Sequence, residues 1–305
     1  GPMERDDIDR DGWLYVFTPE ADVPARLQDA PELVTPMEFK VRGSSSALFP
    51  KKGYNVELKA RSGGDDPQPL LGMPASEDWA FVAPWNYDRA FIRNALGYTL
   101  ARQMGYWAPR TRFAEGFLNA DGGSLTASDY QGIFIITERI LFGSDRVNLE
   151  PPSPSATTEP EITGGYILKL DGRDPDEFGF RTNRGVPSFP ESEFVVARPK
   201  AADLPEPHRA YLRHYIQVME DTIYEEQAAG FTTRKYQDFI DVPSWIDLHL
   251  LNVFLSNADA LLRSVYFTKA PGGKLIAGPV WDFDRSAGSA DERTMNPETW
   301  QHTLA

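Results

Sequence analysis

The sequence contains no cysteine and only four histidines. Without thiols the chain cannot form disulfides, use a thiolate nucleophile or build a zinc–cysteine site. The histidines are His208, His214, His249 and His302, and no two of them lie at the helical spacing of a metal-binding pair. These absences argue against a catalyst based on cysteine or histidine.

Long apolar runs and a positive net charge are also missing. No apolar run approaches the roughly 20 residues of a membrane-spanning helix, so we expect no membrane span. The formal net charge of −14 argues against nonspecific nucleic-acid binding. The start Gly1-Pro2-Met3 resembles a protease scar, so we expect a native signal peptide to be absent from this sequence. The lack of cysteine leaves the compartment open.

The chain has enough apolar sequence for one large core or two modest lobes, since 41% of its 305 residues are hydrophobic. Residues 1–36 predict an arm or partial strand, residues 37–200 a β-rich lobe with one helix, and residues 201–305 a helical lobe. Apolar alternation and turn residues predict strands at 37–41, 54–58, 79–82, 112–118, 130–137, 166–170 and 193–197. Glycine and proline predict loops at 61–76 and 150–162.

Three helices are predicted from apolar spacing. The first runs from an Asp88 cap to Met104, and its inner face is expected to carry Ile92, Leu96, Leu100 and Met104. The second has an amphipathic stripe made of Leu212, Tyr215, Ile216, Met219 and Ile223. The third, 243–255, is apolar nearly all round and is expected to be central and buried. A short hairpin of strands at 265–268 and 274–281 follows it.

Two carboxylates at the end of this hairpin form the most informative pattern. Asp282 and Asp284 follow an apolar run and are spaced i, i+2, so they can converge on one ion just past a strand end. Mg²⁺ takes carboxylate oxygens together with phosphate and water. The structural alternative is that Asp282 caps a turn and Asp284 pairs with an arginine such as Arg285.

Other polar residues stand at the ends of predicted elements. Asn257 and Asp259 follow the apolar helix, and Asp259 could position or deprotonate a hydroxyl nucleophile. The alternative is a helix C-terminal turn with Asn257 in the left-handed conformation. Lys51 and Lys52 follow a glycine/serine turn and can place an ammonium group over phosphates, or simply protect an edge strand.

Taken together, these segments resemble the spore-coat CotH family of atypical protein kinases. The matching pieces lie in the same order between about residues 41 and 286. They are Arg42-Gly43-Ser44-Ser45, Phe49-Pro50-Lys51-Lys52-Gly53-Tyr54, Ile92-Arg93-Asn94, Tyr130-Gln131-Gly132 through Glu138-Arg139-Ile140, Gly164-Gly165-Tyr166, Asn257-Ala258-Asp259 and Gly278-Pro279-Val280-Trp281-Asp282-Phe283-Asp284.

The resemblance implies an α+β, kinase-like fold of two lobes that uses ATP with Mg²⁺ or Mn²⁺ to phosphorylate protein serine or threonine. By position, Lys52 or Lys51 would contact the nucleotide phosphates, and Glu138 would orient that lysine. Asp259 would be the catalytic carboxylate, and Asp282 the main metal ligand with Asp284 beside it. This division of roles agrees with what phosphoryl transfer requires.

Further expectations rest on the same resemblance. Arg42, Asn257 and Ser264 are additional candidates for the nucleotide site, and Ser264 stands near where some relatives have an asparagine metal ligand. Lys169 stands where an acidic residue is expected. The resemblance also implies a bacterial protein that is secreted or at the cell surface.

Two other functions remain open from the sequence. One is a kinase-like surface or structural module with weak or no catalysis, which Arg263-Ser264 and the acidic composition favour. The other is a hydrolase with paired acids, for which Asp259 and Asp282 could flank a glycosidic bond.

Overall fold

The computed structural model describes residues 8–20, 23–185, 192–260, 262–294 and 296. His302 lies outside these ranges. The fold is α+β, as predicted, and the chain divides into two compact units. Unit 1 comprises residues 1–91 and 110–139, and unit 2 comprises residues 92–109 and 140–305.

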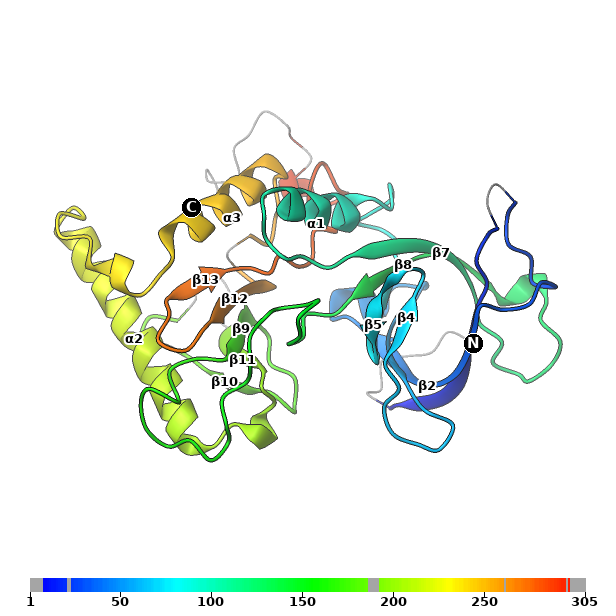
Figure 1. The fold of residues 1–305 in the computed structure, drawn as a ribbon. Helices are drawn as coiled ribbons and strands as arrows, with labels where there is room; N and C mark the ends of the chain where they lie inside the picture. The colour runs from blue at the N-terminus through cyan, green and yellow to red at the C-terminus, as the bar shows by residue number, and fades with distance from the viewer. Residues whose placement is uncertain (1–7, 21–22, 186–191, 261, 295, 297–305) are drawn as a thin grey trace. The chain divides into compact units, whose positions relative to one another are not determined.

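Unit 1 is built on an antiparallel sheet of six strands in the order β1-β2-β3-β6-β8-β7. Figure 1 labels β2, β7 and β8 of this sheet. A separate hairpin, β4-β5, accompanies this sheet. The bounds of these strands are β1 Arg10–Val16, β2 Leu33–Arg42, β3 Gly53–Leu58, β4 Gln68–Leu70, β5 Met73–Ser76, β6 Asp78–Val82, β7 Thr111–Phe117 and β8 Tyr130–Glu138. The 61–76 segment, predicted to be a loop, therefore contains a hairpin whose Leu70 and Met73 enter the core of unit 1.

Unit 2 combines a five-stranded antiparallel sheet, ordered β10-β11-β9-β12-β13, with three helices. The strands are β9 Tyr166–Asp171, β10 Phe178–Phe180, β11 Glu193–Arg198, β12 Val265–Lys269 and β13 Leu275–Ala277. The helices are α1 Arg93–Gln103, α2 Glu206–Ala228 and α3 Val242–Phe254. Because β9 pairs with both β11 and β12, the late hairpin joins earlier strands in one sheet. Each unit combines segments that are separate in the sequence. The domain boundaries at residues 36 and 200 stay a prediction.

Helix α2 packs along the sheet of unit 2 and confirms the predicted stripe (Figure 1). Leu212, Ile216 and Met219 are buried against Leu168 and Phe267 of the sheet. Each fully buried apolar side chain contributes about 1.5–3 kcal/mol. This apolar face therefore helps to hold the helix on the sheet.

Helix α1 buries the opposite face from the one predicted. Asn94, Gly97, Tyr98 and Ala101 are buried, whereas Ile92 and two other residues of the predicted inner face, Leu96 and Met104, are exposed. The prediction was wrong because this helix packs through small, polar and aromatic residues, which a search for aliphatic spacing overlooks.

Helix α3 is not the fully buried helix that its composition suggested. Leu248 and Leu251 enter the core, but Ile246, Leu250 and Phe254 are exposed on another face. An N-cap begins the helix, because the Asp241 carboxylate accepts a hydrogen bond from the Ser244 amide at 3.2 Å.

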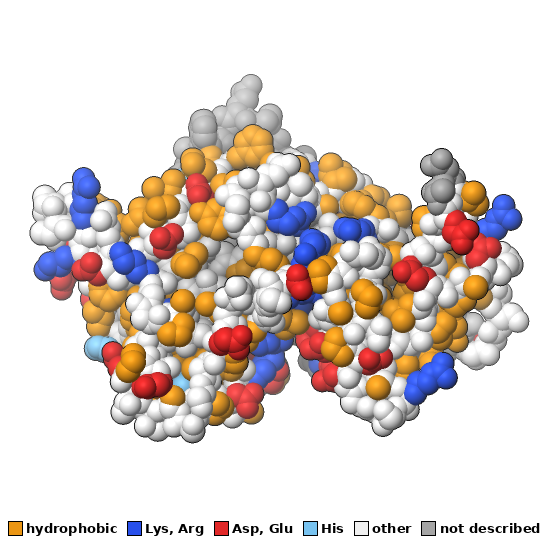
Figure 2. All heavy atoms as spheres, viewed as in Figure 1, with side chains coloured by type: hydrophobic (Ala, Val, Ile, Leu, Met, Phe, Trp, Pro, Cys, Tyr) orange, Lys and Arg blue, Asp and Glu red, His pale blue; other side chains and the backbone are white. Residues whose placement is uncertain are grey.

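Within the described ranges, no helix has both the length and the apolar character needed to cross a bilayer. Figure 2 shows one face of the molecule, on which acidic and basic side chains are interspersed with apolar ones. The excess of negative charge is therefore not gathered into a single acidic patch on that face.

Candidate functional site

The Trp281–Asp284 segment of unit 2 is held by the buried face of α1. The Phe283 amide donates a hydrogen bond to Asn94 Oδ1 at 2.7 Å, and the Asp282 amide donates to the Tyr98 hydroxyl at 3.3 Å. The Tyr98 and Trp281 rings stack with centroids 5.9 Å apart. Two separate pieces of the resemblance, around Asn94 and around Asp282, are therefore one structural unit.

Gly97 has a packing reason to stand inside this helix. A Cβ atom at this position would lie 2.3 Å from Cδ2 of Phe283, which is itself buried. Residues i, i+3 and i+4 share one helix face, so Asn94, Gly97 and Tyr98 together form the surface against which Phe283 packs. Arg93 adds an anchor on the other side, because its Nε donates to the Ser286 carbonyl at 2.7 Å.

Asp282 and Ser264 both adopt the left-handed backbone conformation, with φ of +66° and +55°. Such conformations cost about 1–3 kcal/mol in residues other than glycine and persist where the surroundings impose them. The Ser264 hydroxyl lies 3.5 Å from Asp282 Oδ2 and 3.2 Å from Asp171 Oδ2. A hydroxyl has one proton, so it can donate to only one of the two carboxylates at a time. Three oxygen-bearing side chains thus converge at this point.

Asp171 is a site residue that sequence reasoning missed. It is the last residue of β9, directly after a buried run, so the pattern that drew attention to Asp282 was present here too. Its other oxygen, Oδ1, lies 3.8 Å from Arg263 Nε. The Arg263-Ser264 pair therefore contacts Asp171 through both of its residues.

Asp259 has different neighbours. Its Oδ1 lies 3.0 Å from Arg293 Nη2, and its Oδ2 lies 3.8 Å from Arg285 Nε. Both arginines also contact Asp291, and the hydrogen bond from Arg293 lowers the pKa of Asp291 below its ordinary value. Asp259 is thus part of a four-residue network of alternating charge.

Asn257 shapes the turn between α3 and Asp259. Its Nδ2 donates to Asn252 Oδ1 at 2.8 Å, and its Oδ1 accepts from the Asp259 amide at 3.3 Å. The left-handed residue of this turn is Ser256, with φ of +47°, rather than Asn257. The buried amide of Asn257 therefore fixes the backbone that carries Asp259.

The described residues contain no group of three or more Asp, Glu or His side chains that could by itself hold a metal ion. Asp259, Asp282 and Asp284 are accordingly not gathered into one such group. Two carboxylates and a hydroxyl around Ser264 are nevertheless hard oxygen donors. They fit Mg²⁺, which is held by one or two carboxylates and completed by phosphate and water.

The lysines of unit 1 precede β3, which begins at Gly53, so neither of them lies on a strand. Lys51 Nζ donates to the Ile133 carbonyl and lies 4.8 Å from the centre of the Phe134 ring. Burial lowers the pKa of Lys51. Lys52 Nζ donates to the Ala47 carbonyl at 2.7 Å.

Arg42 and Glu138 belong to the same sheet. Arg42 ends β2 and pairs across the strands with Gly53, next to the two lysines. Glu138 is completely buried and its carboxylate accepts hydrogen bonds from the Arg110 amide at 2.8 Å and the Arg110 Nε at 2.9 Å. Its role in orienting a lysine stays a prediction.

Lys169, in the place of an expected acid, has a structural partner. Its Nζ lies 2.9 Å from Glu177 Oε2, and both side chains are buried. Burial opposes the charge on Lys169, but neighbouring Tyr266 and Glu177 outweigh it and leave the pKa of Lys169 raised. This pair fastens the β9 strand to the loop before β10.

The sequence profile of the CotH kinase protein family matches residues 39–304. The chain belongs to the CotH kinase family. This match covers both units and contains every candidate site residue. No curated protein matches the chain significantly. Membership of a kinase family implies a phosphotransferase that uses a nucleotide and a substrate, and it gives no support to the glycosidase alternative.

Proposed function

We propose that this CotH-family chain is an ATP-dependent protein serine/threonine kinase in which Asp282 is the main ligand of the divalent cation that accompanies the nucleotide. The supporting observation is the convergence of Asp282, Ser264 and Asp171 on a segment that α1 holds in place. Family membership supplies the reaction class.

The proposed cation is Mg²⁺ or Mn²⁺. Asp282 would bind it, with Asp284 beside it, and Asp171 and Ser264 would contribute either directly or through water. A cation held by these residues would supply positive charge that stabilises the negative charge of phosphoryl transfer. Asp282 has a left-handed backbone and its carboxylate lies 3.5 Å from the Ser264 hydroxyl, an arrangement that supports the preorganised ligands that a metal site requires.

Phosphates also need positive charge, and family membership makes the lysine pair Lys51-Lys52 the candidate source. We retain Lys52 as the first candidate for the phosphate contact, with Lys51 and Arg42 beside it. The carbonyls of Ala47 and Ile133 already fix where the two ammonium groups lie. Glu138 is proposed to support this arrangement from β8, where it anchors Arg110.

Asp259 is proposed as the carboxylate that aligns the acceptor hydroxyl. In the transfer, the acceptor oxygen bonds to the γ-phosphorus as the bond to ADP breaks, and the proton of the acceptor passes to a carboxylate. Contacts with Arg285 and Arg293 restrict the rotation of Asp259. Its remaining lone pairs can still accept a hydrogen bond from a hydroxyl.

The direct test is transfer of labelled phosphate from ATP to a serine-rich acceptor protein, compared between the unmodified chain and Asp282→Asn. We expect transfer by the unmodified protein and a loss of at least about 100-fold in the variant, because the main ligand of the cation is gone. Asp203→Asn is the matched control, since Asp203 is exposed on a short helical turn. Equal transfer by the control and by Asp282→Asn would refute the assignment of Asp282.

A second function, a kinase-like binding or structural module without catalysis, is favoured by one observation. Asp259 is already occupied by two arginines, as expected of a carboxylate with a structural role. Thermal unfolding with ATP and Mg²⁺ or Mn²⁺ separates the two functions, because a ligand of the native state raises apparent stability. An unchanged melting temperature at saturating nucleotide would favour the module.

A further inference from the structure

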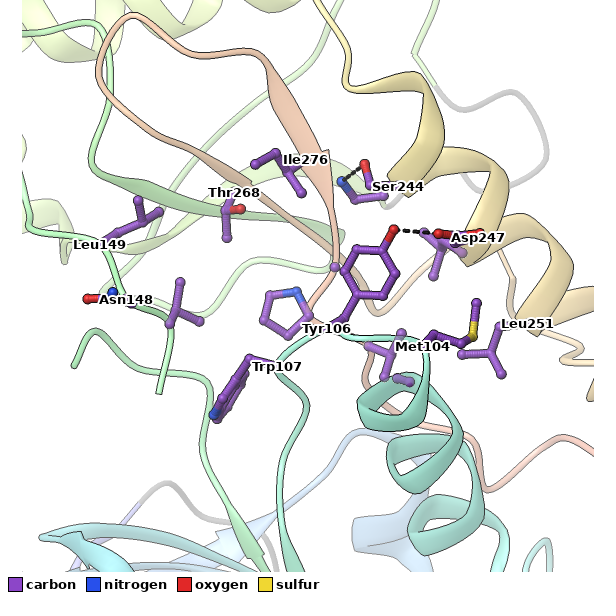
Figure 3. A pocket seen from close by; sticks show the side chains of 17 residues that line it. Met104, Tyr106, Trp107, Asn148, Leu149, Ser244, Asp247, Leu251, Thr268 and Ile276 are labelled. Atoms are coloured by element: carbon purple, nitrogen blue, oxygen red, sulfur yellow. Dashed lines mark hydrogen bonds between the residues drawn. The ribbon is translucent and has the colours of Figure 1, made fainter. Parts of the chain in front are cut away.

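Unit 2 contains a pocket that the proposed phosphotransfer does not use. It encloses about 230 Å³ between the end of α1, the α3 helix and the segment 276–280 (Figure 3). Pockets for drug-sized ligands are usually about 300–1,000 Å³, so this one suits a small molecule. Most of its wall is apolar, with Met104, Leu149, Leu251 and Ile276 among the lining side chains.

A single charge lies in this apolar wall. Asp247, on α3, is the only acidic or basic side chain among the lining residues. Its Oδ2 accepts a hydrogen bond from the Tyr106 hydroxyl at 2.5 Å (Figure 3). Among the described residues, no lysine, arginine or histidine forms an ion pair with Asp247. The carboxylate of Asp247 therefore faces the pocket without a basic partner from the part of the chain that the structure describes.

The Tyr106 hydroxyl stays a donor to this carboxylate. Burial, followed by the hydrogen bond to Asp247, raises the pKa of Tyr106 to about 12. Tyr106 therefore stays protonated at neutral pH and cannot add a second negative charge. It leaves the other oxygen of Asp247 available to a ligand that brings its own donor.

Two aromatic rings stand on the same wall. Tyr106 and Trp107 both line the pocket, and the Trp107 indole is held in place because its Nε1 donates to the Asp145 carbonyl at 3.0 Å. Aromatic faces attract cations, most strongly when the cation is removed from water. A carboxylate, two aromatic rings and an apolar wall together select a cation that has an apolar body.

We propose that this pocket binds a small organic cation, an ammonium group on a short alkyl or arylalkyl body, with the charge at Asp247 and the body against Met104 and Leu251. The inference is independent of the kinase proposal. The ammonium donates to Asp247 in a charge-assisted hydrogen bond, which is about twice as strong as a neutral one. An anion of the same size is excluded, because it would face the Asp247 carboxylate.

The test compares three probes of nearly equal size, phenethylammonium, 2-phenylethanol and 3-phenylpropionate, by isothermal titration calorimetry on the full chain. We expect phenethylammonium to bind at millimolar concentration or tighter. The alcohol should bind at least about tenfold more weakly, and the carboxylate should not bind measurably. Equal affinities for the three probes, or no binding of the cation, would overturn the proposal.

Two variants locate the binding. Asp247→Asn should bring the affinities for phenethylammonium and phenylethanol to within about twofold of each other, because only the charged contact is lost. Glu225→Gln removes the same charge from an exposed position on α2 and should leave the cation preference unchanged.

A melting curve shows whether Asp247→Asn remains folded. If it does not, Tyr106→Phe, which keeps the carboxylate, should retain the preference for the cation over the alcohol. A preference that survives in folded Asp247→Asn, or is lost in folded Tyr106→Phe, would place the cation elsewhere.

Discussion

Two acidic residues of unit 2 lie on adjoining segments but satisfy their charges differently. The segments touch, because the Ala258 amide donates to the Arg285 carbonyl at 3.2 Å and the Ala287 amide donates to the Leu255 carbonyl at 2.5 Å. Asp282 faces the Ser264 hydroxyl near a second carboxylate, whereas Asp259 faces two guanidinium groups. The nearby oxygen donors make Asp282 suited to bind a cation, whereas the two guanidinium contacts make Asp259 suited to hold a fixed position.

The largest expected effects come from replacing these two acids separately. Asp282→Asn and Asp259→Asn should each reduce phosphotransfer by at least about 100-fold, but for different reasons. Only Asp282→Asn should abolish Mn²⁺-dependent binding of a nucleotide, measured by calorimetry with a non-hydrolysable ATP analogue. If Asp259→Asn also lost that binding, the contrast between a metal ligand and an aligning carboxylate would fail.

A smaller effect is expected at Asp171, which shares the Ser264 hydroxyl with Asp282. Asp171→Asn should weaken Mn²⁺ binding in the presence of nucleotide by about 10-fold, the lower end of what residues that orient metal ligands contribute. Asp174→Asn offers a nearby control just beyond β9. Titration of Mn²⁺ followed by electron paramagnetic resonance measures the affinity directly. Unchanged affinity in Asp171→Asn would confine the site to Asp282 and Asp284.

The packing of α1 against Phe283, which supports the segment that carries Asp282, can be tested by measuring the free energy of unfolding. Gly97→Ala should destabilise the protein by about 1–3 kcal/mol, because the new methyl group would overlap the Phe283 ring. Leu96→Ala, one residue away on the exposed face, should cost much less than the roughly 2–5 kcal/mol of a buried leucine. Urea unfolding of both variants provides the comparison. If Leu96→Ala destabilised the protein more than Gly97→Ala, the result would support the aliphatic inner face that was predicted for α1 from the sequence.

Several features of the fold could be predicted from the sequence because they depend on local periodicity. Seven strands and the stripe on α2 follow from alternation and helical spacing, and β12 pairs with β13 in the hairpin that was expected after α3. The buried face of α1 could not be predicted, because Asn94 and Gly97 are buried by contact with Phe283, which lies almost 190 residues further along the chain. That contact has no signature in the helix itself.

Some residues of the candidate site could likewise be predicted from the sequence, whereas their contacts could not. The acids at 282 and 284 were found because they end an apolar run. Asp171 ends a similar run but was passed over, because nothing local links it to Ser264, 93 residues further on. The pairing of Asp259 with Arg293 likewise depends on the path of the chain after Asp284. Residue type and spacing identified the chemistry, whereas the neighbours of each group came only from the structure.

The smallest expected effect concerns another buried charge, Lys269 in β12. Its ammonium group donates to the carbonyls of Thr163 and Gly273 and lies over the faces of Tyr211 and Tyr215. Burial lowers the pKa of Lys269 from 10.5 to about 8, although the charge of Glu159 opposes this shift. Between these two values the unfolded chain binds more protons than the folded chain, so the contribution of Lys269 to stability increases with pH. Below pH 8 both states are protonated and the contribution is constant.

The measurement is urea unfolding from pH 7 to pH 10 for the unmodified chain and for Lys269→Met. Because burial also raises the pKa of Tyr215, to about 12, the tyrosines change stability in the opposite sense at the alkaline end. The difference between the two proteins isolates the lysine, and it should grow in favour of the unmodified chain above pH 8. Lys274→Met, at an exposed position, is the matched control. A difference that does not change with pH would show that Lys269 titrates normally.

The most direct test of the account is anomalous diffraction from crystals grown with Mn²⁺ and a non-hydrolysable ATP analogue. The account predicts a manganese peak at coordination distance from a carboxylate oxygen of Asp282, with Ser264 and Asp171 beside it and the Asp259–Arg293 pair intact. A peak bound by Asp259, or a bound nucleotide with no manganese at Asp282, would contradict it.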